Sequence, residues 1–500
     1  MKRIGLLDSA WLLLERPETP MHVGVLMRFS PPADAPPDFA QQLVQKLRSS
    51  TSAESPWDLI LPTQRLRGLI PLWFHECYLD MEHHVQLHRL PSNGAVAPLD
   101  ALSEQLAALH GQLLDRTRPL WECHVFEGLP GGELALYMKV HHALLDGIAG
   151  SRLMESVFAH TPDTRGLPPP WAPHPSPAIA DRVAPLRAAD GGALAPVAGH
   201  AAPVPGRGVL AYLGQAAREL ARAAVSHADQ LMTPYRTPAA PFNRPVTARR
   251  AYALERCDYA RIQRLAQLGQ VSSNDVVLAV CAGALRRLLA DLDVQGAPLT
   301  AAVPVSTRPR DDHRPGTGTA LSFCLANLGT DIADPRTRLK AIHASTRRAK
   351  EHLGRLPRAA LLPYTATLML PFLVEQLCGW GGRLRPMFNL VISNVPGPKT
   401  PLYLEGARLE AVYPLSLLFH GQGLNITCLR YLDQLSFGFT ACPDALAGTE
   451  SLPGYVRESL AELESELSFP HRVAKRPRRR LPAQTPVVAA APVAAAAAPR

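Results

Sequence analysis

The chain has 500 residues and a formal net charge of +9, and 47% of its residues are apolar. This length predicts two to three domains, and the apolar content excludes a wholly disordered chain. Residues 471–500 carry seven Lys or Arg and no acidic residue, which leaves 45 basic and 43 acidic side chains in the other 470 residues. The basic charge is therefore mostly a property of the tail. No basic, aromatic-bearing module accompanies it, so nucleic-acid binding is disfavoured.

Cysteine usage and apolar runs bear on the cellular compartment. The eight cysteines are scattered without a C-x-x-C pair, and several lie in apolar runs, which predicts free thiols in a reducing compartment. Asp8 interrupts the first apolar run, so we do not expect a secretory signal. The longest apolar stretch, 359–374, contains two prolines and is too short to span a bilayer. We expect a cytoplasmic protein, either soluble or attached peripherally to the inner face of a membrane or to lipid droplets.

Composition divides the chain into four regions. Residues 1–160 carry regular apolar patterning and form the expected N-terminal domain. Residues 161–244 are rich in Pro, Ala and Gly, which predicts a linker with one helix at about 209–232. Patterned sequence resumes at 245–470, the expected C-terminal domain, and 471–500 is expected to be a disordered tail.

Both patterned regions predict mixed α/β structure. Alternating apolar residues over 134–140 indicate a half-buried strand, and helical spacing follows at 154–158. Further along, 275–289 predicts a helix and 301–305 a short strand, while 424–440 predicts a hairpin that turns near Asp433. The two regions are similar in size and style, which fits a pseudo-duplicated architecture.

The segment H-H-A-L-L-D-G, from His141 to Gly147, lies between the predicted strand and the next helix. A corner of this kind holds side chains rigidly and leaves them accessible, and a neutral histidine takes a proton from a hydroxyl near pH 7. Asp146 would orient the imidazole of His142 or pair with an arginine. The simpler interpretation is a capped helix start with one buried histidine. A metal site would need a third ligand at suitable spacing.

The motif resembles the H-H-x-x-x-D-G motif of acyltransferases related to chloramphenicol acetyltransferase and to peptide-synthetase condensation domains. Its surroundings are similar to the bacterial wax ester synthase/diacylglycerol acyltransferase family. The similar blocks follow the family order and are L-D-S-A-W-L at 7–12 with Glu15 and P-M-H-V-G at 20–24, R-P-L-W-E at 118–122, the histidine motif, N-R-P at 243–245, N-D-V-V-L-A at 274–279, P-V-S-T-R at 304–308 and S-N-V-P-G-P at 393–398.

This resemblance implies an α/β fold of two chloramphenicol-acetyltransferase-like mixed-sheet domains, joined by the long linker, with an active-site channel between them. It implies transfer of a fatty acyl group from acyl-CoA, as co-substrate, to the hydroxyl of diacylglycerol or a long-chain alcohol, without a metal or other cofactor. His142 matches the family's general base, which activates the hydroxyl for direct attack on the thioester. His141 is assigned a supporting role, and Asp146 matches a mainly structural residue.

Several positions keep two interpretations. Asn274 would orient the acceptor or stabilise the oxyanion, or it caps the helix that follows. Residues 393–394 would shape the site or form only a turn. Arg308 would pair with Asp146, contact CoA phosphates or be solvated. Thr319 stands where the family usually has Asn, which bears on substrate preference or rate.

Two segments suggest contact with lipid. Residues 361–377 are apolar enough to line an acyl tunnel or rest in an interface, or they form a core helix kinked by Pro371. The cluster at 475–480 would attract anionic lipid or be a solvated tail. Two other functions remain open from sequence: a related acyltransferase with another acceptor or a carrier-bound donor, and a non-catalytic member that binds lipid droplets.

Overall fold

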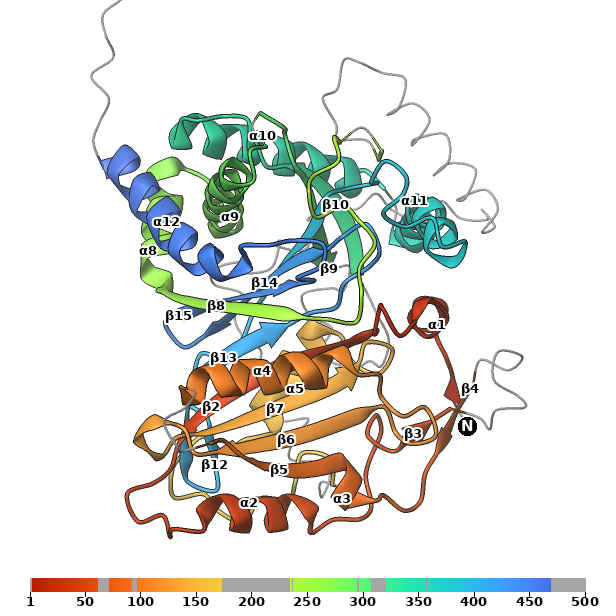
Figure 1. The fold of residues 1–500 in the computed structure, drawn as a ribbon, viewed down its shortest axis with the longest axis vertical. Coiled ribbons are helices and arrows are strands. Elements are labelled where there is room, and N and C mark those ends of the chain that lie inside the picture. The colour runs from red at the N-terminus through yellow and green to blue at the C-terminus, as the bar shows by residue number, and fades with distance from the viewer. Residues whose placement is uncertain are drawn as a thin grey trace, which may run out of the picture.

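The chain forms two α/β halves stacked on one another in a computed structural model (Figure 1). Among the described residues, each half is built around a six-stranded sheet. The helix expected at 209–232 and the tail at 471–500 lie outside the described residues. The structure describes residues 2–61, 72–91, 97–172, 234–235, 237–294, 296–306, 321–356 and 358–468.

The first sheet is mixed, because β5 and β6 run parallel while its other neighbouring pairs run antiparallel. A small separate sheet pairs β1, β4 and β3 beside it. The first sheet has the order β12 (Tyr403–Leu404), β13 (Ala407–Leu415), β2 (His22–Ser30), β7 (Leu134–His141), β6 (Trp121–Glu127) and β5 (Val85–Arg89), and the small sheet contains β1 (Lys2–Arg3), β4 (Leu72–His75) and β3 (Leu59–Ile60).

The second sheet is also mixed. Strand β11 pairs in parallel with both β9 and β14, whereas the outer pairs are antiparallel. Two mixed sheets are what the resemblance implied. The order is β10 (Leu321–Asn327), β9 (Thr300–Ser306), β11 (Leu390–Val395), β14 (Leu424–Tyr431), β15 (Gln434–Ala441) and β8 (Ala251–Asp258).

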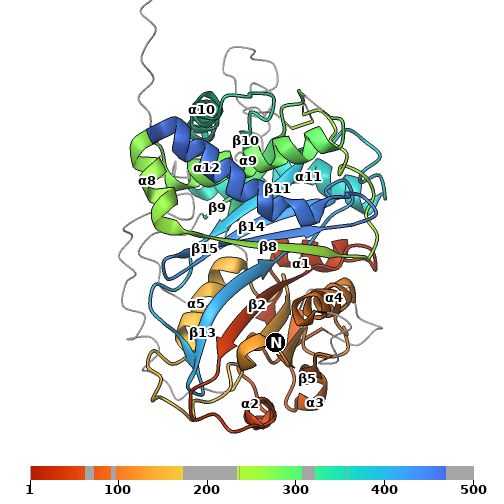
Figure 2. The same cartoon turned by 60° about the vertical axis from the view of Figure 1, so that its left-hand side comes forward.

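A crossover that the sequence patterning did not predict joins the two halves. Strand β13 comes from the C-terminal region, yet it pairs with β2 in the first sheet, as Figure 2 shows. It also lies against β15, where a Cβ at Gly438 would stand 1.8 Å from the carbonyl oxygen of Pro414. Only glycine permits this approach. The two halves are therefore held together by paired and closely packed backbone.

Helices cover both faces of the first sheet. Leu43 of α2 and Met154 of α5 belong to the same apolar cluster as Leu136, while Leu106 of α4 packs with Tyr137 on the opposite face. The helices of this half are α1 (Leu6–Leu14), α2 (Phe39–Arg48), α3 (Met81–His84), α4 (Pro98–Gly111) and α5 (Gly147–Val157).

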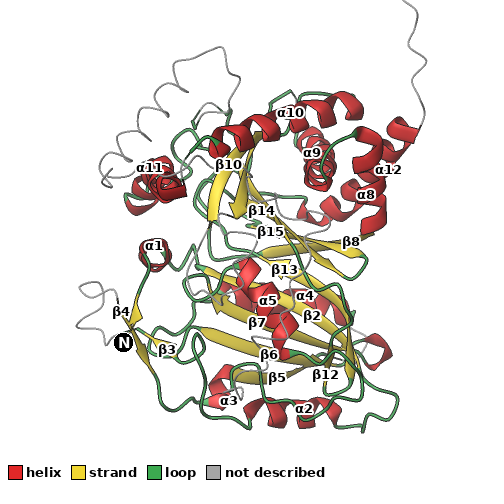
Figure 3. Cartoon of the chain, turned by 180° about the vertical axis from the view of Figure 1, so that it is seen from behind, coloured by secondary structure: helices red, strands yellow, loops and turns green. Residues whose placement is uncertain are grey.

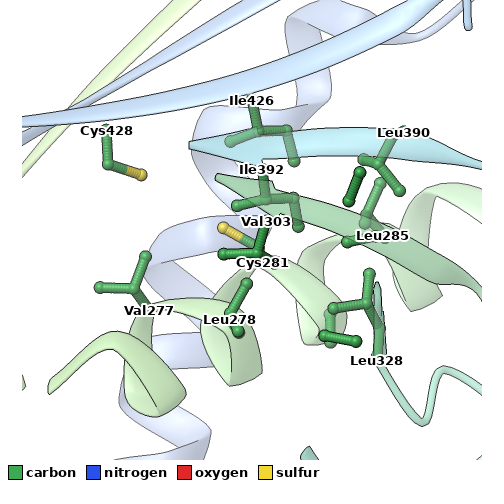
Figure 4. Close-up of a cluster of buried hydrophobic side chains, with 14 of the residues drawn as sticks. Val277, Leu278, Cys281, Leu285, Val303, Leu328, Leu390, Ile392, Ile426 and Cys428 are labelled. Carbon is green, nitrogen blue, oxygen red and sulfur yellow. The ribbon is translucent and has the colours of Figure 1, made fainter. Parts of the chain in front are cut away.

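Helix α9 is the central helix of the second half. Its side chains Val277, Leu278, Cys281 and Leu285 are buried against the sheet strands β9, β11 and β14 (Figure 4). The helices of this half are α8 (Tyr259–Gly269), α9 (Ser273–Asp291), α10 (Pro335–Gly354), α11 (Arg358–Leu377) and α12 (Leu452–Ser468).

Most local expectations are confirmed. The strand at 134–140 lies within β7, the helix at 275–289 lies within α9, and 424–440 forms the hairpin β14–β15. All eight cysteines are free thiols, six of them buried. In the described part of the chain no single helix is long and apolar enough to cross a membrane, and α8 and α9 pass that test only as a pair bent by 103°.

Candidate active site

A cavity of about 540 Å³ lies between the two halves. The first half contributes side chains from α1, β2, β7 and α5, and the second half contributes side chains from α11, β11 and β14. Most of the lining is apolar. Such a space suits a hydrocarbon chain, with a few polar groups left to orient the reacting atoms.

His142 lines this cavity at the corner between β7 and α5. Its backbone N–H donates to the carbonyl of Met21 (2.9 Å), and its ring lies against Trp11 with the ring centroids 4.4 Å apart and the ring planes tilted by 31°. The Nδ1 atom is enclosed and has no hydrogen-bond partner among the described residues. The remaining nitrogen, Nε2, is therefore the one available to a molecule in the cavity.

Burial lowers the pKa of His142, and this effect outweighs the opposing influence of the Asp146 carboxylate and of the residue's own backbone. The uncharged imidazole is consequently the stable form at neutral pH. An uncharged imidazole facing an apolar space can act as a proton acceptor.

Asp146 caps α5, which confirms the interpretation of the motif as a capped helix start. Its carboxylate accepts the backbone N–H of Ala149 (2.8 Å), and its side chain also borders the cavity. One turn later, the hydroxyl of Ser151 donates to the carbonyl of Pro396 in the second half (2.7 Å). The cap therefore fixes the corner that carries His142, and Ser151 ties this corner to the opposite half.

His141 points away from the cavity and is fully buried. Its Nδ1 accepts the backbone N–H of Ala143 (3.1 Å), which leaves the ring proton on Nε2, and Nε2 faces the Glu15 carboxylate at 3.4 Å. The two adjacent histidines thus differ in environment, since Nδ1 of His141 is hydrogen-bonded and its Nε2 faces a carboxylate, although it makes no hydrogen bond in the described part of the chain.

Glu15 links both histidines to the rest of the site. Its carboxylate accepts hydrogen bonds from the side chain of Arg116 (2.8 Å) and the backbone N–H of Met21 (3.2 Å), the residue whose carbonyl holds His142. Burial alone would raise the pKa of Glu15, but the contacts with His141, Arg116 and Met21 outweigh it and lower this pKa to about 2. Sequence comparison placed Glu15 in a family block without a role.

Asn274 is not the helix cap. Ser272 caps α9 through a capping box with Asp275, and Asn274 lies within the first turn, 3% exposed. The side-chain oxygen Oδ1 of Asn274 accepts a hydrogen bond from the side chain of Asn394 (3.3 Å). The Nδ2 atom of Asn274 has no partner in the described part of the chain. Asn394 borders the cavity whereas Asn274 lies behind it.

Residues 393–394 belong to strand β11, which ends at Val395, and not to a turn. The expectation of a turn fails because the apolar stretch that starts at Leu390 continues the parallel pairing with β14. Ser393, Asn394, Asn425 and Thr427 bring polar groups to the cavity from these two strands. The alternation of polar and apolar residues in β14 was the available signal for Asn425 and Thr427.

Residues 361–377 lie within α11, which contributes both to the core and to the wall of the cavity. Leu361, Tyr364 and Leu368 are buried in the core, while Met369 and Leu373 line the cavity. Arg308 and Thr319 lie outside the described residues. Within the described ranges, no three His, Cys, Asp or Glu side chains are grouped in a way that would hold a metal ion.

The fold and the histidine corner define the class of two-domain acyltransferases and condensation domains. The first condensation domain of the calcium-dependent antibiotic synthetase has the same fold, with a TM-score of 0.56 at 15% identity over 94% of this chain and 96% of that one. At this identity the likeness concerns the fold alone.

Family models identify the particular group. The wax ester synthase/diacylglycerol acyltransferase catalytic domain matches residues 4–277, and the C-terminal domain of the same family matches residues 317–464. The chain therefore belongs to the wax ester synthase/diacylglycerol acyltransferase family, as the sequence blocks indicated.

Individual relatives agree with this assignment. The O-acyltransferase WSD of Acinetobacter baylyi is 34% identical, over 94% of this chain and 98% of that protein. A Mycobacterium tuberculosis protein named for an inferred diacylglycerol O-acyltransferase activity is 35% identical, over 92% of this chain and 97% of its own length. The solved wax ester synthase/diacylglycerol acyltransferase of Marinobacter aquaeolei is 31% identical, with a TM-score of 0.72 over 94% of this chain and 100% of that chain.

Proposed function

We propose that the protein transfers a fatty acyl group from acyl-CoA to the hydroxyl of diacylglycerol or of a long-chain alcohol, with His142 as the general base. The observation that carries the proposal is a histidine, with a pKa lowered by burial, bordering an apolar cavity of about 540 Å³ at the junction of the two halves. Family membership supplies the reaction class.

In the proposed reaction Nε2 of His142 takes the proton of the acceptor hydroxyl. The oxygen attacks the thioester carbonyl carbon, a C–O bond forms, and the C–S bond breaks. The proton on the imidazole then passes to the departing CoA thiolate, so the histidine returns to its uncharged form. Because this transfer neither oxidises nor reduces a substrate, it consumes no redox cofactor, and acyl-CoA acts as a co-substrate.

We assign positioning roles to Asp146, to His141 with Glu15, and to Asn274. Asp146 fixes the corner through its cap of α5, and His141 with Glu15 holds the backbone beside His142. Asn394, which lines the cavity, would donate to the oxyanion, and Asn274 would orient it through the 3.3 Å hydrogen bond. This assignment gives Asn274 an indirect role.

The test is ester synthesis by the purified full-length chain. Labelled acyl-CoA is offered together with diacylglycerol and hexadecanol, and the triacylglycerol and wax ester products are separated and counted. We expect ester from at least one acceptor and none above background from His142→Ala. Ester formed only from a carrier-bound acyl group would favour a condensation-like donor, and droplet binding without any turnover would favour a non-catalytic member.

A further inference from the structure

Helix α11 is apolar on its outward face as well as on its buried face. Leu370, Val374 and Leu377 follow helical spacing, and each is more than two-fifths exposed. An amphipathic helix of a protein surrounded only by water normally turns charged side chains outward. The exposed apolar face of α11 therefore indicates that this face contacts a second apolar environment.

This exposed face continues beyond the helix and onto α1. Helices α1 and α11 lie in contact on the same side of the molecule, as Figures 1 and 3 show. We call the combined area the α1–α11 surface. Its members are all between 42% and 55% exposed and are Leu13, Leu370, Val374, Leu377, Trp380 and Leu384.

The α1–α11 surface borders the mouth of the cavity. Leu13 and Leu370 are exposed to solvent and also line the cavity between the two halves. The apolar lining of the cavity is thus continuous with the apolar exterior at this point. A hydrocarbon chain could pass from one to the other without crossing a polar rim at these two residues.

The turn after α11 holds Trp380 in place. The backbone N–H of Trp380 donates to the carbonyl of Glu375 (2.9 Å), and the side chain of Gln376 donates to the carbonyl of His420 (3.0 Å). Gly382 adopts φ +74°, and a Cβ there would lie 2.5 Å from the carbonyl carbon of Arg244. The exposed side chains are therefore presented by a packed turn.

The exposed charges on the α11 part of this surface have one sign. Over 366–385, where every residue is described, the exposed charged side chains are those of Arg383 and Arg385. The acidic residue in this range, Glu375, is buried, and burial raises its pKa. Exposed leucines and a tryptophan flanked by arginines match the boundary between acyl chains and anionic head groups.

We infer that the α1–α11 surface docks on a phospholipid layer carrying anionic head groups, with its apolar side chains in the acyl region and its arginines at the phosphates. The inference rests on the proposed function in one respect, because it makes the lipid acceptor the molecule that passes from the layer into the cavity. Docking at the cavity mouth would spare the acceptor a transfer through water.

The first test measures binding of the full chain to vesicles of phosphatidylcholine and phosphatidylglycerol by flotation. The double variant Leu377→Ser/Leu384→Ser alters the surface without touching the cavity lining. We expect its partition coefficient to fall by about tenfold or more. The matched control, Leu99→Ser/Leu268→Ser, removes two leucines that are 50% and 48% exposed on α4 and α8, and it should bind like the unmodified chain.

A second test separates charge from apolar contact. Arg383→Gln should weaken binding to the mixed vesicles by about fivefold and leave binding to pure phosphatidylcholine vesicles unchanged. All variants retain the basic tail, so any contribution from residues 475–480 is common to them. Equal loss on both kinds of vesicle would contradict the assignment of Arg383 to anionic head groups.

Two results would overturn the docking surface. One is equal vesicle binding by Leu377→Ser/Leu384→Ser and its control. The other is light scattering that shows a dimer of the unmodified chain and a monomer of that variant, because a second copy would then cover the surface. Turnover on detergent-dispersed substrate is measured in parallel, and its absence from the unmodified chain would contradict the proposed function and not the docking surface.

Discussion

The two faces of the first sheet are both buried, but they differ in their polar side chains. One face lines an apolar cavity, and the other carries polar side chains that contact one another. On the cavity face, Leu136, Met138 and Val140 of β7 surround an apolar space, and His142 stands at its edge. On the opposite face, the intervening residues Tyr137 and Lys139 have polar partners. Alternation along one strand thus separates a reactive environment from a paired one.

The face away from the cavity carries a network of paired polar groups. The Lys139 ammonium lies 3.2 Å from the Glu122 carboxylate, which also faces His124 at 3.3 Å. His110 contacts the Tyr137 hydroxyl at 2.5 Å. Burial lowers the pKa of Lys139 while Glu122 opposes this shift. Groups paired in this way stabilise one arrangement, and they lie outside the lining of the cavity.

The adjacent histidines show what the difference means. His141 continues the paired face, in contact with Ala143 and Glu15, whereas His142 lies on the cavity side with its ring tilted against Trp11. Pairing makes a buried histidine structural, and an unpaired ring beside a cavity is available for proton transfer. Five expected outcomes follow, beginning with the largest effect.

Replacing the unpaired histidine should remove most of the activity. For His142→Ala we expect kcat/KM to fall by about 10²- to 10⁴-fold, because general-base assistance is lost. The unfolding midpoint in urea should change little, since the ring makes no hydrogen bond to another side chain among the described residues. Initial rates of ester formation and urea titrations measure the two quantities. Retained turnover would contradict the role of His142.

Removing the Glu15 carboxylate, which contacts His141, should mainly lower the stability of the fold. Glu15→Gln removes the buried charge that Arg116 and His141 contact, and we expect the free energy of unfolding to fall by about 3 kcal/mol. Glu18→Gln, an exposed change three residues later, is the matched control. Urea denaturation at pH 7 measures both. A Glu15→Gln protein as stable as the control would show that the network is dispensable.

The lowered pKa of Glu15 predicts that the stability of the protein depends on pH. Its pKa is lowered from 4.5 to about 2 in the folded chain, so its contribution is complete above about pH 4.5 and is lost as the pH falls toward 2. The stability difference between the unmodified chain and Glu15→Gln should therefore shrink across this window. Denaturation at a series of pH values follows it, and a constant difference would be inconsistent with this pKa.

The smallest expected effects concern rates. Asn274→Ala should lower kcat by about fivefold to tenfold with little change in KM, because one hydrogen bond to Asn394 is lost. Asn394→Ala should have the larger effect if Asn394 contacts the oxyanion. An Asn274→Ala effect larger than that of Asn394→Ala would give Asn274 the direct contact.

The pH profile of kcat/KM sharpens the assignment of the base. Because burial lowers the pKa of His142 below its usual 6.5, the uncharged base persists below that pH, and the acid limb should lie under pH 6.5. Between pH 6.5 and 7.5 the rate should stay nearly level. An acid limb above pH 6.5 would contradict the lowered pKa.

Local patterns in the sequence were enough to predict several elements and the reactive corner. Alternation identified β7, helical spacing identified α9, and the histidine motif placed His142 and Asp146 between a strand and a helix. These features depend on neighbours within a few residues, so periodicity and capping chemistry are visible in the chain itself. The family blocks extended this to the two mixed sheets.

Contacts between distant segments were decided only by the tertiary structure. Strand β13 pairs with β2 across some 380 residues of sequence, and no local property of 407–415 indicates which sheet it joins. Likewise, Glu15 meets His141 and Arg116, and Trp11 meets His142, because folding brings separate elements together. Periodicity gives the face of a strand but not its neighbour, so the partner that makes His141 structural appears only in the folded chain.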